Sequence, residues 1–508
     1  RPPRPPSRAH TCPIIRPFTH NSQLRLVVSP SAPRPQLPFL HSTTRALKYG
    51  PTGGQWQIAR LLTTEQRRRV KDTVWLAGKY TVFIWIGGFM LFVASYGVWQ
   101  QLQEWDTPTP HEWSLFCRSF YRSAQAAEDP AFDARGFTDW VVVGPLWRTV
   151  MRELESTLLE EGKELREHQT RPSFASNVDS TCFDLTDKSE PWRRGYFEVL
   201  MGCARSAQNL TESILDITTH ICWPKVCMVG PSNPNPRPVP PNVDDPPPLE
   251  EHCVPTFDRP EKFYVKILTS KGFNTEQRLE AAIAYGDWLN SENLSSEAEE
   301  AYRWGLDIAT SAIPNVGAII DTRTSVIHSE GASTAVSTNI VNAATALATH
   351  YARSANVDAA LPIFLSILRA RRAAPPSDDY PSASSAPSDN IMDKMLRLLV
   401  QPPYPPPPPS LDLPLRRTAD SQYKEAVLMM YIGEILFATS PPSRETGLAW
   451  TRKAAQLAEG GIDDPQLARQ DRIMCVQCLE TALENWEKMA AVLAREERVR
   501  RAEAAQGW

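Results

Sequence analysis

The most apolar part of the chain is an uncharged run of 24 residues between Lys79 and Glu104. Its centre, Thr81–Trp99, would span about 28 Å as a helix, close to the roughly 30 Å hydrocarbon core of a bilayer. Aromatic side chains of the kind found at membrane interfaces bracket it: Trp75, Tyr80, Trp99 and Trp105. A buried helix of a soluble protein is the alternative, but the length and the flanks favour a single transmembrane helix at 80–102.

Past this span, apolar residues recur at helical spacing, and almost no segment alternates as a strand does. Prolines mark the joints: twelve lie from Pro224 to Pro260 and twelve from Pro375 to Pro414, which predicts extended connectors or loops there. We therefore predict an all-α protein. The parts expected after the span are a helical region at 112–222, a proline-rich connector at 223–260, helical repeats at 261–372, an insertion at 373–417, and a last repeat with a capping helix at 418–508.

The clearest repeat lies at 274–310, where Asn274 and Ser295 are expected N-caps and Ser296 with Glu299 forms a capping box. Small and aromatic residues follow there in the order of two closely packed antiparallel helices: Ala282, Tyr285, Gly286, Leu289, Ala298 and Tyr302. The pattern returns in Ala344, Leu347, Ala348, Tyr351, Ala360 and Phe364, and more weakly in Met429, Ile432, Gly433 and Leu436, followed by Trp450–Ala454. It resembles the tetratricopeptide repeat (TPR), so we predict a TPR-like α-solenoid with long insertions.

A long helix from Pro465 to about Arg500 is expected to close this solenoid. Asp464 can cap it, and proline suits its first turn. Its apolar face consists of Cys475, Cys478, Leu479, Ala482, Trp486, Met489 and Leu493. Cys475 and Cys478 form a C-x-x-C, but their place on this face favours buried apolar side chains over a redox pair.

Charge is distributed unevenly. Residues 1–64 carry nine basic side chains and no acidic one, whereas the whole chain has 54 basic and 58 acidic residues. The acidic remainder argues against nucleic-acid binding. An acid-free N-terminus without a long apolar run is typical of a mitochondrial presequence, expected at 1–50, and a basic tail without a targeting role is the alternative. Because a basic segment at 60–79 precedes the span, we expect the N-terminal side in the matrix and the body in the intermembrane space.

No catalytic spacing is present, so we expect no enzymatic activity and no cofactor. His111-Glu112 lacks the second histidine of a zinc protease helix, and the chain has neither a phosphate-binding glycine loop nor a nucleophile elbow. Zinc-ligating residue types gather around the connector: His220, Cys222, Cys227, His252 and Cys253. Their spacing is unusual for zinc, so free thiols are expected, with a metal site or a Cys222–Cys227 disulfide as open alternatives.

The predicted repeats offer a groove. In a TPR the first helix of each pair lines the concave face through its second, fifth, ninth and twelfth positions. Those positions are Glu280, Ile283, Asp287 and Asn290; Asn342, Thr345, Thr349 and Ala352; and Val427, Met430, Glu434 and Phe437. This lining mixes polar and apolar side chains without a cation, so it lacks the clamp that binds chaperone carboxylates. It suits extended or partly unfolded segments better.

The chain resembles the fungal TPR-containing adaptor of the mitochondrial i-AAA protease. The similar stretches are LLTTEQRRRVKDTVWLAGKYTVFIW, SEPWRRGYFEVLMGCARSAQNL, VGPSNPNPRPVPP, YVKILTSKGFNTEQRLEAAIAYGDWL and EEAYRWGLDIA. The resemblance extends from about Leu61 to the last helix, apart from proline-rich stretches at Pro375–Pro387 and Pro402–Pro409. It implies a non-catalytic inner-membrane subunit that, beside a second membrane adaptor, delivers unfolded proteins to the protease. The alternative is a TPR scaffold or import receptor in the outer membrane.

Overall fold

A computed structural model describes residues 64–131, 136–165, 178, 181–239, 245–311, 313–328, 336–376, 402–418, 421–464 and 467–506. The expected presequence at 1–50 and much of the insertion expected at 373–417 lie outside these residues. The chain divides into two compact units, Arg1–Met90 and Leu91–Trp508.

Helix α2, Thr64–Asp106, includes both the expected span and most of the basic segment before it. Within the described residues it is the one helix that is long and apolar enough to cross a membrane, by length and composition. None of its most apolar window is buried inside the protein, unlike the core helix of a soluble protein. Thr81 donates its hydroxyl to the Ala77 carbonyl at 2.8 Å, so this polar group is satisfied within the helix.

The second unit is mostly helical. Its α-helices beyond the end of α2 are α3 (Leu115–Glu128), α4 (Trp140–Glu160), α5 (Glu190–Leu210), α6 (Pro260–Thr269), α7 (Thr275–Ser291), α8 (Ser295–Thr310), α10 (Thr338–Arg353), α11 (Val357–Ala373), α13 (Ser421–Thr439), α14 (Arg444–Ile462) and α15 (Arg469–Gln506). Short 3₁₀ helices are η2 (Lys225–Cys227), η3 (Glu250–His252), η4 (Val316–Ala318) and η5 (Pro441–Ser443). The strands are β1 (Glu164–Leu165), β2 (Cys182–Phe183), β3 (Ser213–Asp216), β4 (Cys222–Pro224) and β5 (Cys253–Pro255).

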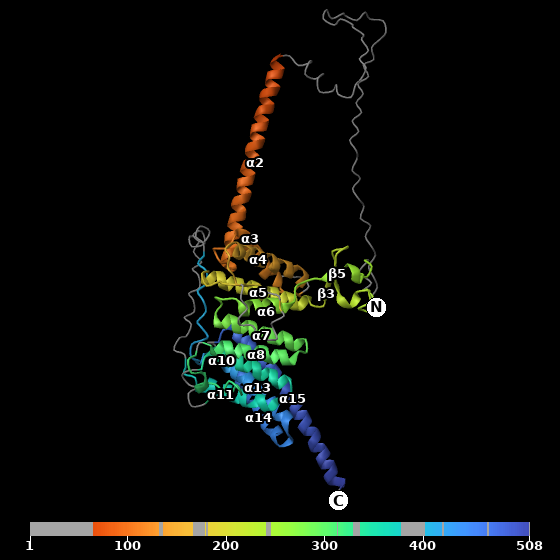
Figure 1. The fold of residues 1–508 in the computed structure, drawn as a ribbon, viewed down its shortest axis with the longest axis vertical. Coiled ribbons are helices and arrows are strands. Elements are labelled where there is room, and N and C mark those ends of the chain that lie inside the picture. The colour runs from red at the N-terminus through yellow and green to blue at the C-terminus, as the bar shows by residue number, and fades with distance from the viewer. Residues whose placement is uncertain are drawn as a thin grey trace, which may run out of the picture. The chain divides into compact units, whose positions relative to one another are not determined.

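The helices pack largely in chain order, as Figure 1 shows for α4 to α8. Helix α8 contacts α10, α10 packs on α11, α11 contacts α13, and α13 packs on α14, with α15 against both α13 and α14. One cluster of buried apolar residues extends through these helices, from Trp113 to Ala482. The prediction of a helical chain with one apolar N-terminal helix is confirmed at this level.

Paired helices approach most closely at glycines. At Gly286 on α7, a Cβ atom would lie 2.7 Å from the ring of Tyr302 on α8. At Gly433 on α13, it would lie 2.9 Å from the carbonyl oxygen of Gly447 on α14. The residues predicted to pack between paired helices are buried, except Leu436, which is half-buried.

The two predicted helix starts in the first pair have different outcomes. Asn274 caps α7 in a capping box with Gln277, whose side-chain oxygen accepts from the Asn274 amide at 3.0 Å. The box predicted for α8 is wrong: its N-cap is Leu294, and no side chain caps the helix. Glu299 instead forms charge-assisted bonds with Arg303 and the hydroxyl of Tyr351 on α10, so its carboxylate is not available for the helix start.

The connector expected at 223–260, predicted as extended segments or loops, also contains short strands and 3₁₀ helices. Strand β3 lies between β4 and β5 in an antiparallel sheet. A separate buried cluster supports it: Ile214, Trp223, Cys227 and Met228. Strands β1 and β2 form a second antiparallel pair. Strands of two to four residues are too short to show an alternating pattern, which explains why the sequence did not reveal them.

The proline run that ends the insertion lies against the body. The Nε2 atom of His111 lies 3.0 Å from the Pro402 carbonyl oxygen. The guanidinium of Arg194 on α5 stacks 4.5 Å from the Tyr404 ring centroid and donates to the carbonyls of Pro405 and Pro406. Extended proline segments make no internal hydrogen bonds, so their carbonyls remain available to such donors. This part of the insertion is therefore a docked segment.

The last helix begins at Arg469, later than predicted, and Pro465 lies outside the described residues. Its predicted apolar face packs on α13 and α14. Cys475, Cys478, Ala482 and Met489 are buried, and Leu479, Trp486 and Leu493 are half-buried.

Candidate functional site

An open cavity of about 450 Å³, which we call the groove cavity, lies along the first helices of three successive pairs, α7, α10 and α13. Six of the twelve predicted groove residues line it: Ile283, Asp287, Asn342, Thr345, Thr349 and Val427. Tyr302 from α8 and Met474 from α15 also line it. The structure thus brings together side chains from three segments that lie far apart in the sequence.

Helix α10 contributes a stripe of four polar side chains, Asn342, Thr345, Thr349 and Arg353, at spacings that place them on one helix face. The two threonine hydroxyls donate to carbonyls one turn earlier, at 2.6 and 2.8 Å, and are satisfied. The half-buried side chain of Asn342 makes no hydrogen bond to any residue that the structure describes. Its amide therefore presents an unused donor and an unused acceptor at the cavity surface.

Three cations reach the groove cavity: Arg353 of α10, Arg371 of α11 and Lys424 of α13. The prediction of a lining without a cation is therefore wrong. Arg353 continues the α10 stripe one turn beyond Thr349, and the other two come from positions outside the predicted inner stripe. Long basic side chains can extend their charge away from their own helix position, which a count of inward-facing positions does not include.

Among the described residues that line the groove cavity, Asp287 is the one carboxylate. It accepts a hydrogen bond from the Tyr302 hydroxyl at 2.7 Å and lies 3.8 Å from Nη1 of Arg353. Burial, with a further contribution from Asp287, raises the pKa of Tyr302, so its hydroxyl remains a donor. The Asp287–Arg353 pair is more than half exposed on both sides, so its attraction is weak.

The other predicted groove residues do not line the groove cavity. Met430 is buried, Glu434 accepts a hydrogen bond from Asn485 of α15, and the Phe437 ring lies beneath the Arg444 guanidinium. Helix α15 packs on α13 and covers this end of its inner face, which explains the difference. Three further residues lie outside the lining: Glu280, Asn290 and Ala352.

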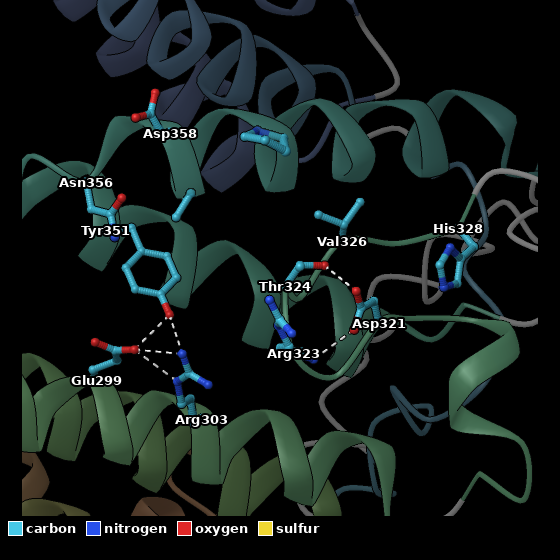
Figure 2. Close-up of a pocket in the computed structure, with 12 residues that line it drawn as sticks. Glu299, Arg303, Asp321, Arg323, Thr324, Val326, His328, Tyr351, Asn356 and Asp358 are labelled. Carbon is cyan, nitrogen blue, oxygen red and sulfur yellow. Dashed lines mark hydrogen bonds and ion pairs between the residues drawn. The ribbon is translucent and has the colours of Figure 1, made fainter.

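A second cavity, of about 540 Å³, lies between α8, α10, α11 and the loop that includes Asp321 (Figure 2). Two of its carboxylates, those of Glu299 and Asp321, are already bonded within the protein. Glu299 accepts from Arg303 at 2.8 Å and from Tyr351 at 2.9 Å, and Asp321 accepts from the Arg323 amide at 2.9 Å. These contacts hold the loop and the helices in place, which is a structural role.

The cysteine and histidine residues around the connector do not converge. Among the described residues, no group of three or more His, Cys, Asp or Glu side chains could hold a metal ion. Cys222 and Cys227 carry free thiols rather than a disulfide. Cys475 and Cys478 are also free and buried, and burial raises the pKa of Cys478 to about 11. Such a thiol stays protonated and is a poor nucleophile.

No family model, no curated protein and no solved structure matches this chain. The groove cavity and the apolar helix α2 are the two features of the molecule that bear on its function.

Proposed function

We propose that this protein is a non-catalytic TPR adaptor of the inner mitochondrial membrane. It binds unfolded membrane or intermembrane-space proteins and presents them to the i-AAA protease for degradation, beside a second membrane adaptor. The groove cavity is the observation that supports this proposal most strongly. Residues that the TPR pattern predicts to face inward, from the first helix of each of three pairs, line this one cavity.

The lining of the groove cavity supports peptide binding rather than catalysis. Ile283 and Val427 offer apolar surface, and Asn342 offers an amide without a partner among the described residues. The hydroxyls of Thr345 and Thr349 are bonded to their own helix, so no activated nucleophile is formed there. An open surface of this composition can contact many different extended segments.

The N-terminal part supports the membrane location. Helix α2 is long and apolar enough to span a bilayer. Nine basic and no acidic side chains among residues 1–64 favour a mitochondrial presequence and an N-terminal side that faces the matrix. With this orientation, the groove cavity faces the intermembrane space.

Protease protection of a C-terminally tagged chain tests this location. A tag that is protected in intact mitochondria and digested in mitoplasts is the expected result. Loss of the gene should then slow the turnover of i-AAA substrates without lowering the ATPase activity of the protease. Unchanged turnover would contradict the adaptor function.

One observation favours a second function, a receptor in the outer membrane that binds acidic chaperone tails. Arg353, Arg371 and Lys424 supply the positive charge that the predicted lining lacked. In that case the tag would be digested in intact mitochondria, a result that would overturn the adaptor proposal.

A further inference from the structure

We infer that the groove cavity selects extended segments of unfolded proteins in which an acidic side chain lies between apolar ones. This inference rests on the proposed adaptor function and names the class of segment that the adaptor takes.

The charged side chains that line the groove cavity are mainly basic. Within the part of the chain that the structure describes, Arg353, Arg371 and Lys424 line the groove cavity together with a single carboxylate, that of Asp287. The whole chain has the opposite balance, with 58 acidic and 54 basic residues, so this concentration of cations differs from the rest of the protein. Clustered positive charge attracts an acidic side chain and disfavours a basic one.

Arg371 is buried and Arg353 is exposed, and each of these positions favours the binding of a ligand carboxylate. Arg371 is only 8% exposed, so its positive charge acts from within the protein, where screening by water and salt is reduced. The side chain of Arg353 is 58% exposed, and its contact to Asp287 is long, at 3.8 Å. A ligand carboxylate can therefore approach Arg353 without breaking a close ion pair, and an arginine can bind it through two parallel hydrogen bonds.

Apolar surface borders these cations. Ile283 and Val427 are half-buried, and Met474 is 42% exposed at the edge that α15 provides. A methionine side chain adapts its shape to different apolar partners, as a site for varied sequences requires. Apolar residues on either side of the acidic one would contact this surface.

Asn342 supplies recognition that does not depend on the side chains of the ligand. Its amide lies on the same α10 face as Arg353 and makes no hydrogen bond within the described part of the chain. An extended peptide presents unpaired backbone N–H and C=O groups, which an amide can bind at the same time. Folded segments bond these groups internally, so the site favours unfolded ones.

The test uses the full chain in lipid nanodiscs and two short fluorescent peptides that differ only in Asp or Asn between leucines. Fluorescence anisotropy measures the two dissociation constants at low and at high salt. We expect the Asp peptide to bind about fivefold more tightly at low salt, because its carboxylate is attracted by Arg353 and Lys424, and we expect the difference to shrink at high salt.

Variants of the basic residues test whether the groove cavity causes the difference in affinity between the Asp and Asn peptides. The double variant Arg353→Gln/Lys424→Gln should bind both peptides equally and retain the affinity for the Asn peptide. Arg452→Gln is the matched control, because Arg452 is exposed on α14 and does not line the groove cavity. The reversed variant Arg353→Glu/Lys424→Glu should prefer a peptide with Lys in place of Asp. This gain of binding would show that the variant is folded.

The outcomes separate the two proposals. If the wild-type chain binds neither peptide, the adaptor proposal fails together with this inference. Equal binding of the Asp and Asn peptides would overturn the selectivity and leave the adaptor function standing. A preference for Asp that persists in Arg353→Gln/Lys424→Gln would overturn the groove cavity as its source.

Discussion

Two regions of the second unit are stabilised in different ways. The helices α3 to α6 enclose ion pairs: Nζ of Lys266, a residue only 2% exposed, lies 2.5 Å from the carboxylate of Glu155. At the C-terminal end of α2, Glu104, also 2% exposed, pairs with Arg118 of α3 at 2.7 Å.

Between α7 and α14 the paired helices approach closely at Gly286 and Gly433, a device that the first region also uses at Gly202. The buried Glu425 of this second region pairs with Arg372 and Arg417, whose side chains are nearly half exposed rather than enclosed. There, charged side chains line the groove cavity, and those of Asp287 and Arg353 are more than half exposed.

The difference between the contacts that stabilise the two regions affects which side chains can bind a ligand. Charges that bond one another inside a core cannot bind a ligand, whereas small residues bring helices together without using any polar group. The second region can therefore place its polar side chains on a surface. The four predictions below test whether the two regions depend on these different contacts, from the largest expected effect to the smallest.

The largest effect is expected for Glu155→Ala. Glu155 accepts from Lys266 and, at 3.0 Å, from the buried Tyr196 hydroxyl, so its loss leaves a buried ammonium group without its carboxylate. Breaking such a pair lowers the free energy of unfolding by about 3–5 kcal/mol. Urea unfolding of the full chain measures it.

A double variant and a surface variant serve as controls for Glu155→Ala. Glu155→Leu/Lys266→Met removes both charges and should recover much of the lost stability. Glu484→Ala breaks an exposed pair with Lys488 and should leave the urea midpoint unchanged. If Glu155→Ala behaves like Glu484→Ala, the first region does not depend on its buried charges.

A smaller loss is expected for Gly433→Ala in the second region. The added Cβ would meet the Gly447 carbonyl oxygen at 2.9 Å and the Thr451 hydroxyl at 2.4 Å. Because part of this obstacle is backbone, α13 and α14 must separate, at a cost of about 2 kcal/mol. Thermal unfolding of the full chain measures the change.

Gly460→Ala is the matched control for Gly433→Ala. Gly460 lies in α14, and a Cβ atom added there would meet no other group within 4 Å. The higher helix propensity of alanine should raise stability there by about 0.5–1 kcal/mol. If the unfolding temperatures of Gly433→Ala and Gly460→Ala shift in the same direction, close contact between α13 and α14 does not determine the stability of this region.

The same contrast explains how much the sequence predicted. Small residues that recur at helical spacing leave a local pattern, so the pairs around Gly286 and Gly433 could be predicted. Glu155 and Lys266 lie 111 positions apart, and no local pattern connects them. Half of the residues predicted for the groove line the groove cavity, and Thr345 and Thr349 are among them. Glu434 does not, because bonding to α15 is a tertiary contact that the repeat pattern cannot indicate.

Tyr302→Phe tests the link between helix packing and the groove cavity. The Tyr302 ring fills the space beside Gly286, and its hydroxyl donates to Asp287 at 2.7 Å. The variant keeps the ring and loses the hydrogen bond, which should lower stability by about 1 kcal/mol. Tyr431→Phe is the control, since the Tyr431 hydroxyl makes no hydrogen bond to other described residues, and urea unfolding compares the two. Equal midpoints would show that the bond to Asp287 does not contribute.

The smallest expected effect is a pH dependence that arises from His350 in α10. This side chain is 2% exposed and lies 5.3 Å from the Tyr302 ring, between centroids. Burial lowers the pKa of His350; Glu299 opposes this shift and Arg353 adds to it. The unfolded chain therefore takes up the proton near the usual pKa of about 6.5, while the folded chain does so only at lower pH.

Stability from this group is fully present above about pH 6.5 and is lost as the pH falls towards the lower pKa of the folded state. The urea midpoint of the wild-type chain should therefore fall between about pH 7.5 and about pH 5.5. Other groups also titrate in this range, so the comparison is with His350→Gln, which cannot take up a proton and should show a smaller fall. An equal fall in both chains would mean that burial does not hold His350 neutral.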